Sequence, residues 1–419
     1  MTVIAIVGTG IAGDEAAITA RQTDPETRII MVGREAYPLY SACVLADFVS
    51  GEISADNVFL RKKEDYSLKG IELLLSTPVV DWSPDKRLLS LGNAEISFDR
   101  LVLATGSKPF VPPIPGIEKE GVLVLKTFDD AEAMRSAKGK SAVVIGSGPI
   151  GIEAAAALRR RGWSVAIVEL MGRILPRLFD IPLTDVLTRK LTAEGIQIFP
   201  GEKVIEIIGG KNVEEVRTDK QSLKADMVVV VVGMRPETQL AEKAGLTIGV
   251  DGGIQVDNQM KTSCPGVWAC GDCAVTRDMV SGKEGLYMLW SNARLQGRVA
   301  GANACRKNKK YPGSLNITTV NFFEQAAASA GILMTDLADG ESQVLHQEKS
   351  WGSFWLVMQN DHLVGIQVIG QTERIGGLTG LLLKKQNLRK SIMGDAKAPA
   401  GREMWAMQGF QRDLRELLR

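Results

Sequence analysis

The stretch that decides the fold is Val3-Ile4-Ala5-Ile6-Val7-Gly8-Thr9-Gly10-Ile11-Ala12-Gly13, near the start of the chain. It begins with an apolar run of strand length and continues with three glycines in the spacing GxGxxG. An Ala-rich stretch with helical character follows over residues 14–22, and another apolar run follows over residues 28–32. Strand, glycine turn, helix and strand in this order are the βαβ fingerprint of a dinucleotide-binding domain.

The same order of elements occurs again in the middle of the chain. An apolar run over residues 142–145 leads into Gly146-Ser147-Gly148-Pro149-Ile150-Gly151, a helical stretch over 152–161 and an apolar run over 164–168. The first glycine permits the tight turn, the second lets the backbone approach a pyrophosphate, and the third lets the helix pack on its strand. One such motif is weak evidence. Two copies in the correct context predict two dinucleotide sites.

A carboxylate about 20 residues beyond the glycines is expected to bind a ribose hydroxyl. In the second copy this residue is Glu169, which follows the strand predicted over 164–168. A carboxylate there accepts from the 2′-hydroxyl and repels a 2′-phosphate, so the second site should prefer NAD(H), with Arg173 moderating the preference. In the first copy the nearest acid after the strand is Glu35, which lies slightly late.

Composition excludes several classes of protein. The chain has 419 residues, which indicates two to four domains at roughly 100–200 residues each, and 50 Lys and Arg against 49 Asp and Glu leave a net charge of +1. That balance does not suit a dedicated nucleic-acid binder. No apolar run approaches the ~20 residues of a membrane span, and the start of the chain lacks the basic residues of a signal peptide. With five cysteines, too few for a disulfide scaffold of this length, a cytoplasmic protein is expected.

Three further segments have the character of strands that end at turns. Residues 101–107 run into Thr105-Gly106, and residues 228–232 run into Gly233 in the corresponding place after the second fingerprint. Residues 266–272 form a short strand that ends in Gly271-Asp272, before an expected helix. A carboxylate at a strand end is well placed to bind a sugar-like hydroxyl, although Gly-Asp is also a common turn.

These motifs, in this order, resemble one family. The chain resembles the FAD- and NAD(P)-dependent pyridine nucleotide–disulfide oxidoreductases over about residues 1–385. The resemblance rests on the two fingerprints, Ala104-Thr105-Gly106, residues 233–236 and residues 269–272. The nearest branch is that of NADH oxidases, coenzyme A disulfide reductases, rubredoxin reductases and nitrite-reductase flavin domains. The resemblance implies a doubly wound α/β protein. An FAD domain (1–113 and 241–313) is split around an NAD domain (114–240), and a C-terminal α+β interface domain (314–419) follows.

The resemblance also implies the cofactor contacts. The FAD contacts are expected at Gly8, Gly10, Ile11, Ala12, Gly13, Glu35, Val79 (at the adenine), Thr105, Gly106, Gly271 and Asp272 (at the ribityl chain). The NAD(H) contacts are expected at Gly146, Gly148, Pro149, Ile150, Gly151, Glu169 and Gly233.

Cys43 is the candidate redox thiol. It lies just before a helix expected over residues 46–51, where the helix dipole would stabilise a thiolate. In the coenzyme A disulfide reductases and NADH oxidases that the chain resembles, a single cysteine in a similar segment exchanges electrons with the flavin. The alternative is a small buried side chain beside the flavin, as in the relatives that carry no redox cysteine there.

The sequence departs from the thiol branch in its histidines. NADH oxidases and peroxidases carry a histidine inside the first glycine loop, where this chain has Ile11. Its two histidines, His346 and His362, fall in the C-terminal segment, so a thiol would lack its usual base and peroxide reduction is not expected. A metal site could be considered for the other four cysteines, Cys264, Cys270, Cys273 and Cys305. We interpret them instead as small buried side chains, and no metal is predicted.

The C-terminal part suggests a hairpin and a docking helix. Apolar runs at 354–358 and 363–366, joined by residues 359–362, are typical of a β-hairpin. A helical segment over residues 403–418 places Trp405, Phe410 and Leu414 broadly on one side. It either packs on its own domain or docks to a partner subunit, and the resemblance implies a homodimer or hetero-oligomer.

Two enzymatic hypotheses remain, with a third of another class. The favoured one is a flavoprotein that exchanges a hydride between NADH and FAD and passes electrons to or from a redox protein or iron–sulfur subunit, such as the NADH-linking subunit of a keto-acid oxidoreductase complex like phenylglyoxylate dehydrogenase. The alternative is a reductase in which Cys43 attacks a disulfide or persulfide such as coenzyme A disulfide. The third, a redox-sensing binding protein, is disfavoured because both nucleotide motifs are intact.

Overall fold

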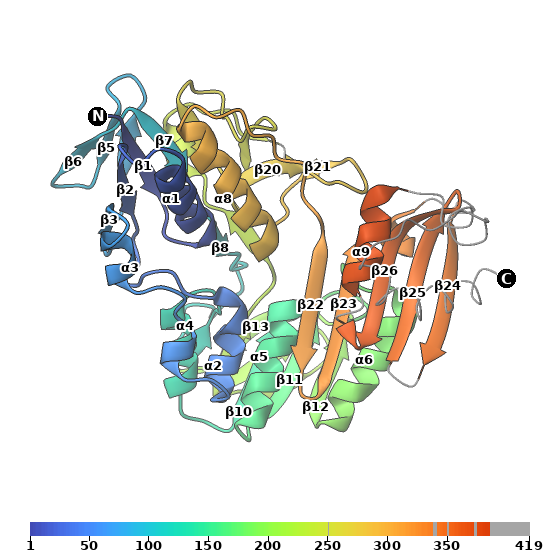
Figure 1. Ribbon diagram of the computed structural model, residues 1–419. Helices are drawn as coiled ribbons and strands as arrows, with labels where there is room; N and C mark the ends of the chain where they lie inside the picture. Colours follow the sequence, from blue (N-terminus) through green and yellow to red (C-terminus); the bar gives the residue numbers. More distant parts are fainter. Residues whose placement is uncertain (250, 338–341, 350–351, 373–374, 386–419) are drawn as a thin grey trace.

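The computed structural model describes residues 1–385 except 250, 338–341, 350–351 and 373–374 (Figure 1). Two parallel sheets and one antiparallel sheet form its three main parts. The helical segment expected over residues 403–418 lies outside the described residues. Within them, no helix has the length and apolar character that crossing a membrane requires.

The first parallel sheet grows around the first fingerprint. Its strand order is β19-β7-β1-β2-β3, with all pairs parallel. The bounds are β1 (Val3–Val7), β2 (Arg28–Val32), β3 (Ile71–Leu74), β7 (Arg100–Leu103) and β19 (Val267–Ala269). Helices α1 (Ile11–Thr23) and α8 (Trp290–Ala304) lie side by side over this sheet (Figure 1). A Cβ on Gly297 or Gly301 of α8 would run into carbonyl oxygens of α1, so both glycines are needed for this close packing.

The second parallel sheet grows around the second fingerprint in the order β12-β11-β10-β16-β9. The bounds are β9 (Val122–Leu123), β10 (Ser141–Ile145), β11 (Ser164–Glu169), β12 (Ile196–Pro200) and β16 (Met227–Val230). Its helices are α4 (Phe128–Ser136), α5 (Pro149–Arg160) and α6 (Ile181–Ala193). The three central strands, β11, β10 and β16, are buried almost throughout, as their continuous apolar runs predict for a covered parallel sheet.

Two crossings connect the sheets. Strand β8 (Ser107–Pro109) runs from the first sheet toward the second, and β17 (Met234–Pro236) runs back. The two pair antiparallel, with Lys108 opposite Arg235. All five strands of the second sheet come from between these crossings, which agrees with an inserted domain; the exact bounds 1–113, 114–240, 241–313 and 314–419 stay predictions.

Shorter elements surround the sheets. They are α2 (Leu45–Ser50), α3 (Lys63–Ser67), α7 (Gln239–Lys243), β4 (Asp81–Ser83), β5 (Leu88–Ser90), β6 (Glu95–Ser97), β13 (Val204–Ile208), β14 (Glu215–Thr218), β15 (Ser222–Lys224), β18 (Ile254–Gln255), β20 (Ala274–Arg277) and β21 (Glu284–Gly285), with the 3-10 turns η1 (Ala42–Val44), η2 (Ala55–Asn57) and η3 (Met334–Asp336).

The C-terminal part is an antiparallel sheet in the order β22-β23-β26-β25-β24, which α9 (Ile375–Lys384) covers on one face. The bounds are β22 (Ile317–Phe322), β23 (Gln325–Gly331), β24 (Ser342–Lys349), β25 (Gly352–Gln359) and β26 (His362–Gly370). The predicted hairpin is confirmed as β25–β26. Its turn residues Asn360 and Asp361 both have positive φ, the conformation that Asn and Asp tolerate best among non-glycine residues.

One expectation is wrong. The chain continues after Asp272 as strand β20, between β18 and β21, and the helix begins only at Trp290. Val275 and Thr276 are β-branched, which favours a strand. The turn at Gly271 directs the chain into this small sheet rather than into a helix.

Candidate functional site

The first glycine loop closes tightly on the backbone of its neighbours. Gly8 has a φ of 118°, and a Cβ there would collide with the Ala104 carbonyl oxygen. A Cβ on Gly13 would collide with the Gly8 carbonyl oxygen, whereas one on Gly10 would meet nothing within 4 Å. Two glycines therefore serve the fold, and Gly10 leaves open space in front of α1.

The second loop repeats this geometry. Gly146 has a φ of 102°, and a Cβ there would collide with the Val231 carbonyl oxygen. A Cβ on Gly151 would collide with the Gly146 carbonyl oxygen, and one on Gly148 would again meet nothing within 4 Å. The sequence prediction of three different tasks for the three glycines agrees with the geometry of both loops.

Both helices that follow these loops have uncapped N-termini. Gly10 and Gly148 are the N-cap residues of α1 and α5, and neither N-terminus receives a side-chain cap. Ile11 and Ala12 form the first turn of α1, and Pro149 and Ile150 form that of α5. Free amides beside an open glycine provide the partial positive charge that a pyrophosphate requires. The residues present therefore fit a dinucleotide in each loop.

Glu169 ends β11 beside the second loop and is buried. Its carboxylate accepts hydrogen bonds from the Ser147 backbone N at 2.9 Å, the Ser147 Oγ at 2.6 Å and the Met171 N at 2.7 Å. It thus fixes the glycine loop as well as the strand end. Arg173, the other group expected to affect nucleotide choice, donates to the Pro176 carbonyl at 3.0 Å.

Glu35 occupies the corresponding region of the first sheet, after β2, and is only partly buried. Its Oε2 accepts a hydrogen bond from the Tyr40 hydroxyl at 2.7 Å. Burial, followed by the nearby Glu35 carboxylate, raises the pKa of Tyr40 far above its ordinary value, so this tyrosine remains a neutral donor. Val79, expected at an adenine, packs at the margin of the core under β1 and β7.

Asp272 follows Gly271, which has a φ of 82°. Its Oδ2 accepts from the Ser107 Oγ at 2.6 Å and lies 3.5 Å from the Lys126 Nζ. Lys126 also donates to the Ser107 Oγ at 3.3 Å. The Asp272 carboxylate thus lies between residues from both sides of the first crossing.

The remaining residues predicted to contact the cofactors, Thr105, Gly106 and Gly233, lie at the two crossings between the sheets. The Thr105 hydroxyl donates to the Glu237 carbonyl at 2.6 Å, across the two crossings. Gly106 and Gly233 both have positive φ, 73° and 123°, and a Cβ on either would meet nothing within 4 Å. These glycines leave the backbone accessible at the point where the two parallel sheets meet.

Cys43 lies in η1, immediately before α2, and is exposed among the described residues. Burial of the sulfur raises the pKa of Cys43, and the Glu153 carboxylate raises it further. A hydrogen bond with Ser41 and the charge of Lys126 lower it, and Asp272 raises it slightly. The expectation of a pKa lowered by a helix dipole is therefore wrong for the protein groups. The α2 helix has only six residues, and the pKa of Cys43 is raised by burial first and by the Glu153 carboxylate second.

The charged groups that shift the pKa of Cys43 come from different parts of the fold. Glu153 belongs to α5 of the second sheet, Asp272 follows β19 of the first, and Lys126 precedes α4. One hydrophobic core joins α2 to α5 and β22 and includes Phe48, Ile152 and Phe322. The tertiary structure thus brings Cys43 within electrostatic range of residues that follow a strand of each parallel sheet.

Sequence reasoning missed Glu153. It is the only acidic residue in the Ala-rich helix α5, and it lies on the side that faces α2 and β22. Burial raises the pKa of Glu153 to about 7, and Asp47 of α2 adds to this against a hydrogen bond from the Asn321 N. A lone carboxylate on an otherwise apolar, buried helix is the signal that could have identified it.

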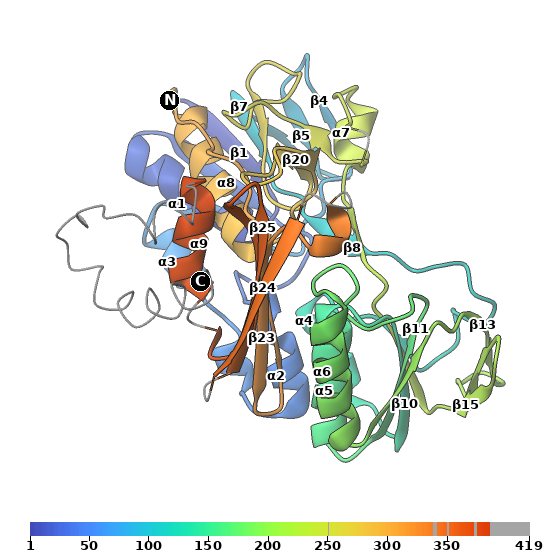
Figure 2. The same cartoon turned by 90° about the vertical axis from the view of Figure 1, so that its right-hand side faces the viewer.

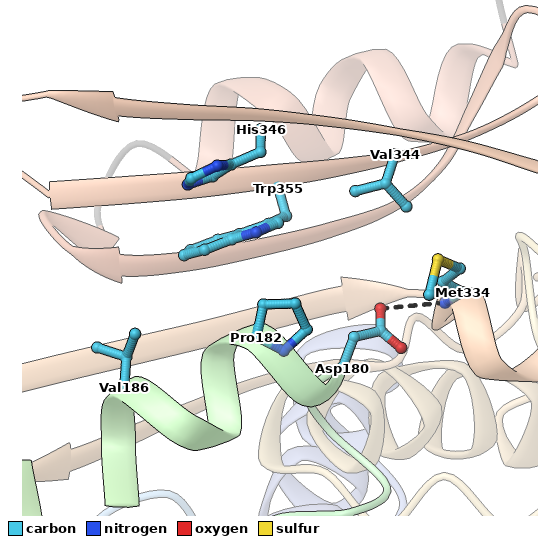
Figure 3. A pocket seen from close by; sticks show the side chains of 7 residues that line it. All are labelled: Asp180, Pro182, Val186, Met334, Val344, His346 and Trp355. Atoms are coloured by element: carbon cyan, nitrogen blue, oxygen red, sulfur yellow. Dashed lines mark hydrogen bonds between the residues drawn. The ribbon is translucent and has the colours of Figure 1, made fainter. Parts of the chain in front are cut away.

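The two histidines lie elsewhere. His346 of β24 stacks on Trp355 of β25, with ring centroids 4.3 Å apart, and both line an apolar cavity of about 480 Å³ between α6 and the C-terminal sheet (Figure 3). Asp180 borders this cavity and accepts from the Met334 N at 3.1 Å (Figure 3). His362 is the first residue of β26, with its Nδ1 2.7 Å from the Asn360 carbonyl. Neither histidine acts on Cys43.

The remaining four cysteines are free. Cys270 and Cys273 are buried beneath the first sheet, and Cys264 and Cys305 belong to the margins of different cores. Over the described part of the chain, no three His, Cys, Asp or Glu side chains lie together in a way that could hold a metal ion.

Two Rossmann-type sheets, each with an open glycine loop before a helix, define an oxidoreductase of the two-dinucleotide class. The family model of the pyridine nucleotide-disulphide oxidoreductases matches residues 2–297. The chain belongs to this family and is an FAD-dependent NAD(P)H oxidoreductase.

Three relatives illustrate the range within the family. An NADH oxidase from Methanocaldococcus jannaschii is 31% identical, with 91% of each chain covered. The NADH-dependent phenylglyoxylate dehydrogenase subunit epsilon from Aromatoleum evansii is 29% identical, with 91% of this chain and 92% of the relative covered. The solved NAD-dependent persulfide reductase from A. fulgidus has a TM-score of 0.89 and 28% identity, covering 95% of this chain and 80% of its own.

Proposed function

We propose that this protein uses NADH to reduce a disulfide or persulfide at Cys43, with FAD as the relay. The FAD would contact Gly8, Gly10, Ile11, Ala12, Gly13, Glu35, Val79, Thr105, Gly106, Gly271 and Asp272. The NADH would contact Gly146, Gly148, Pro149, Ile150, Gly151, Glu169 and Gly233.

The observation that carries this proposal is the position of Cys43. The sequence favours a protein carrier as electron acceptor, because no histidine accompanies the thiol. The structure changes that balance because Cys43 is exposed within electrostatic reach of Asp272, Lys126 and Glu153. An exposed cysteine close to charged residues of both sheets is suited to exchange with a small substrate, and similarity to a persulfide reductase supports the same chemistry.

Bound FAD supplies the capacity to accept a hydride from NADH and to pass two electrons to sulfur. The protein groups bind and orient. The uncapped helix N-termini face the pyrophosphates. Glu169 excludes a 2′-phosphate by charge while it holds the Ser147 loop. The overall change is NADH, one proton and a disulfide converted to NAD⁺ and two thiols.

A second candidate acceptor is a protein carrier or an iron–sulfur subunit. The raised pKa of Cys43 favours it, because a protonated thiol is a poor nucleophile at neutral pH. Similarity to the phenylglyoxylate dehydrogenase subunit supports it as well. In that case the C-terminal domain would dock to the partner; a homodimer or hetero-oligomer and a cytoplasmic location remain part of this proposal.

One experiment separates the two candidates. Wild type and Cys43→Ser are mixed with NADH, and reduction of the flavin is followed by stopped flow. Turnover is then measured with coenzyme A disulfide and, separately, with ferricyanide. We expect both proteins to reduce ferricyanide at similar rates, and disulfide turnover to fall by at least 100-fold in Cys43→Ser. Equal disulfide turnover in both proteins, or none in either, would exclude the thiol mechanism and leave the carrier.

A further inference from the structure

A groove with apolar walls lies between α6 and the C-terminal sheet. It is the cavity of about 480 Å³ that is lined by Asp180, Pro182, Val186, Met334, Val344, His346 and Trp355 (Figure 3). Met334 is 40% exposed, and Ile181, which precedes Pro182 in α6, is 56% exposed. Exposed apolar side chains around a concave site are typical of a place where another element binds.

Contacts between α6 and the C-terminal domain fix the two walls of this groove. Asp180 accepts a hydrogen bond from the Met334 N at 3.1 Å, and its own N donates to the Gln367 Oε1 of β26 at 2.8 Å. Both Asp180 and Gln367 are buried. Lys190, farther along α6, donates to the Gln325 side chain of β23. The groove is therefore a preformed site that these contacts hold open.

The part of the chain that the structure describes ends close to this groove but on the other face of the sheet. Its last residue, Lys385, follows α9 directly. Figure 2 shows α9 and α6 on opposite sides of the C-terminal sheet. Strand β24 is last in the strand order of this sheet, and its Val344 and His346 line the groove. The chain beyond Lys385 therefore reaches the groove by passing around the edge at β24.

The sequence after Lys385 has the length and the pattern that such a groove accommodates. Residues 386–402 reach roughly 55 Å when extended, far more than the ~10 Å that separates packed layers. The helix that the sequence predicts over residues 403–418 would be about 24 Å long. Its apolar residues recur at the spacing i, i+3, i+7 and i+10 of one helix face, as Met407, Phe410, Leu414 and Leu417.

We propose that residues 403–418 dock as a helix in this groove of the same chain. The apolar face of the helix covers Val186, Val344 and the stacked rings of His346 and Trp355. Charge favours this occupant. Residues 386–419 contain seven Lys and Arg against four Asp and Glu, while the described residues that line the groove include the Asp180 carboxylate and no Lys or Arg. The proposal does not depend on which electron acceptor the enzyme uses.

The two histidines of the chain provide the first test. His346 is exposed at the groove in the described part of the chain, and His362, at the start of β26, serves as the internal reference. The full-length holoenzyme and its Leu414→Asp variant are treated with diethyl pyrocarbonate, and the modification of each histidine is followed by mass spectrometry. A docked helix shields His346. We therefore expect His346 to react at least fivefold faster in Leu414→Asp, and His362 to react equally in both proteins.

The matched control is Gln408→Asp, which places the same charge on the opposite face of the predicted helix. It should leave the reaction of His346 at the wild-type rate. Equal rates for His346 in wild type and Leu414→Asp would overturn the proposal, because the apolar face would then cover nothing at the groove. A gain of the same size in Gln408→Asp would overturn it as well.

A photocrosslink identifies the contact itself. The photoreactive residue p-benzoylphenylalanine replaces Phe410 or, as the control, Gln408 in the full-length holoenzyme, and crosslinked peptides are identified by mass spectrometry after irradiation. We expect position 410 to crosslink to α6, β24 or β25 of its own chain, and position 408 to give no crosslink to these elements. Crosslinks from position 410 to α9 alone, or only between two chains on a denaturing gel, would overturn the proposal, the latter in favour of a second copy of the chain.

Discussion

The two fingerprint helices carry a glutamate at the same place, two residues after the third glycine. In α1 this is Glu15, which receives hydrogen bonds from Arg294 at 2.5 Å and from Arg298 at 2.8 Å. Burial alone would raise the pKa of Glu15, but the two guanidinium groups outweigh it and lower that pKa. In α5 the equivalent residue is Glu153, whose pKa burial and Asp47 raise to about 7.

The difference comes from the helices that cover each copy. Helix α8 packs along α1 and brings two arginines to Glu15. Helix α2 packs along α5 and brings Asp47 and Cys43 to Glu153. Equivalent positions of one repeated motif therefore have opposite electrostatics. The motif specifies the nucleotide loop, whereas the neighbouring elements decide whether the pKa of the glutamate is lowered or raised.

The largest expected effect tests the part that the two copies share. Gly13→Ala and Gly151→Ala should each lower the free energy of unfolding by about 3 kcal/mol or more, because the added Cβ meets a backbone carbonyl that cannot move away. Urea unfolding followed by circular dichroism measures this. Gly10→Ala and Gly148→Ala are the controls. Their Cβ atoms meet no protein atom within 4 Å, so stability should stay within about 0.5 kcal/mol while affinity for the dinucleotide falls.

The next prediction concerns the free energy of unfolding of Glu153→Gln. In the folded wild type the pKa of Glu153 lies above its unfolded value of 4.5. Stability therefore falls as pH rises from 4.5 to about 7 and then levels off. The variant lacks this penalty, so it should be more stable than wild type by about 2–3 kcal/mol at pH 8 and similar to it below pH 4.5. If Glu153→Gln were less stable than wild type at pH 8, the raised pKa of Glu153 in the folded protein would be contradicted.

A smaller effect should distinguish Glu169 from Glu35, the two carboxylates proposed to bind ribose hydroxyls. Glu169→Gln keeps an acceptor for the Ser147 loop but loses the negative charge. The preference for NADH over NADPH, as a ratio of kcat/KM, should fall about 10-fold, or about 1.4 kcal/mol. Glu35→Gln in the first copy should leave that ratio unchanged. If both variants changed it equally, the assignment of NAD(H) to the second copy would be wrong.

The smallest effect is expected for Glu15→Gln. Both arginines are about half exposed, with side-chain exposures of 51% and 47%, so solvent can replace the lost carboxylate. We expect a loss of about 1 kcal/mol at pH 7. The pKa of Glu15 is lowered by folding, so its contribution is present above pH 4.5 and disappears as pH falls through the folded pKa. Thermal unfolding at pH 7 and pH 3 should show a smaller difference between the two proteins at pH 3 than at pH 7.

The sequence by itself determined the two nucleotide-binding loops and the family. Glycine spacing, apolar runs and strand-end acids are local properties, and local geometry alone requires Gly8, Gly13, Gly146 and Gly151. The hairpin of β25 and β26 was predictable for the same reason, since alternation and an Asn-Asp turn act within a few residues.

Only the tertiary structure decided the electrostatics of the site. Cys43 was expected to have a lowered pKa from its place before a helix, yet burial and then the Glu153 carboxylate, distant in the sequence, raise that pKa. Glu153 lies within a fingerprint helix, and its raised pKa depends on the elements α2 and β22 that cover α5. A pKa depends on burial and on every charge within several ångströms. Those neighbours come from three segments separated by more than a hundred residues, so no local pattern records them.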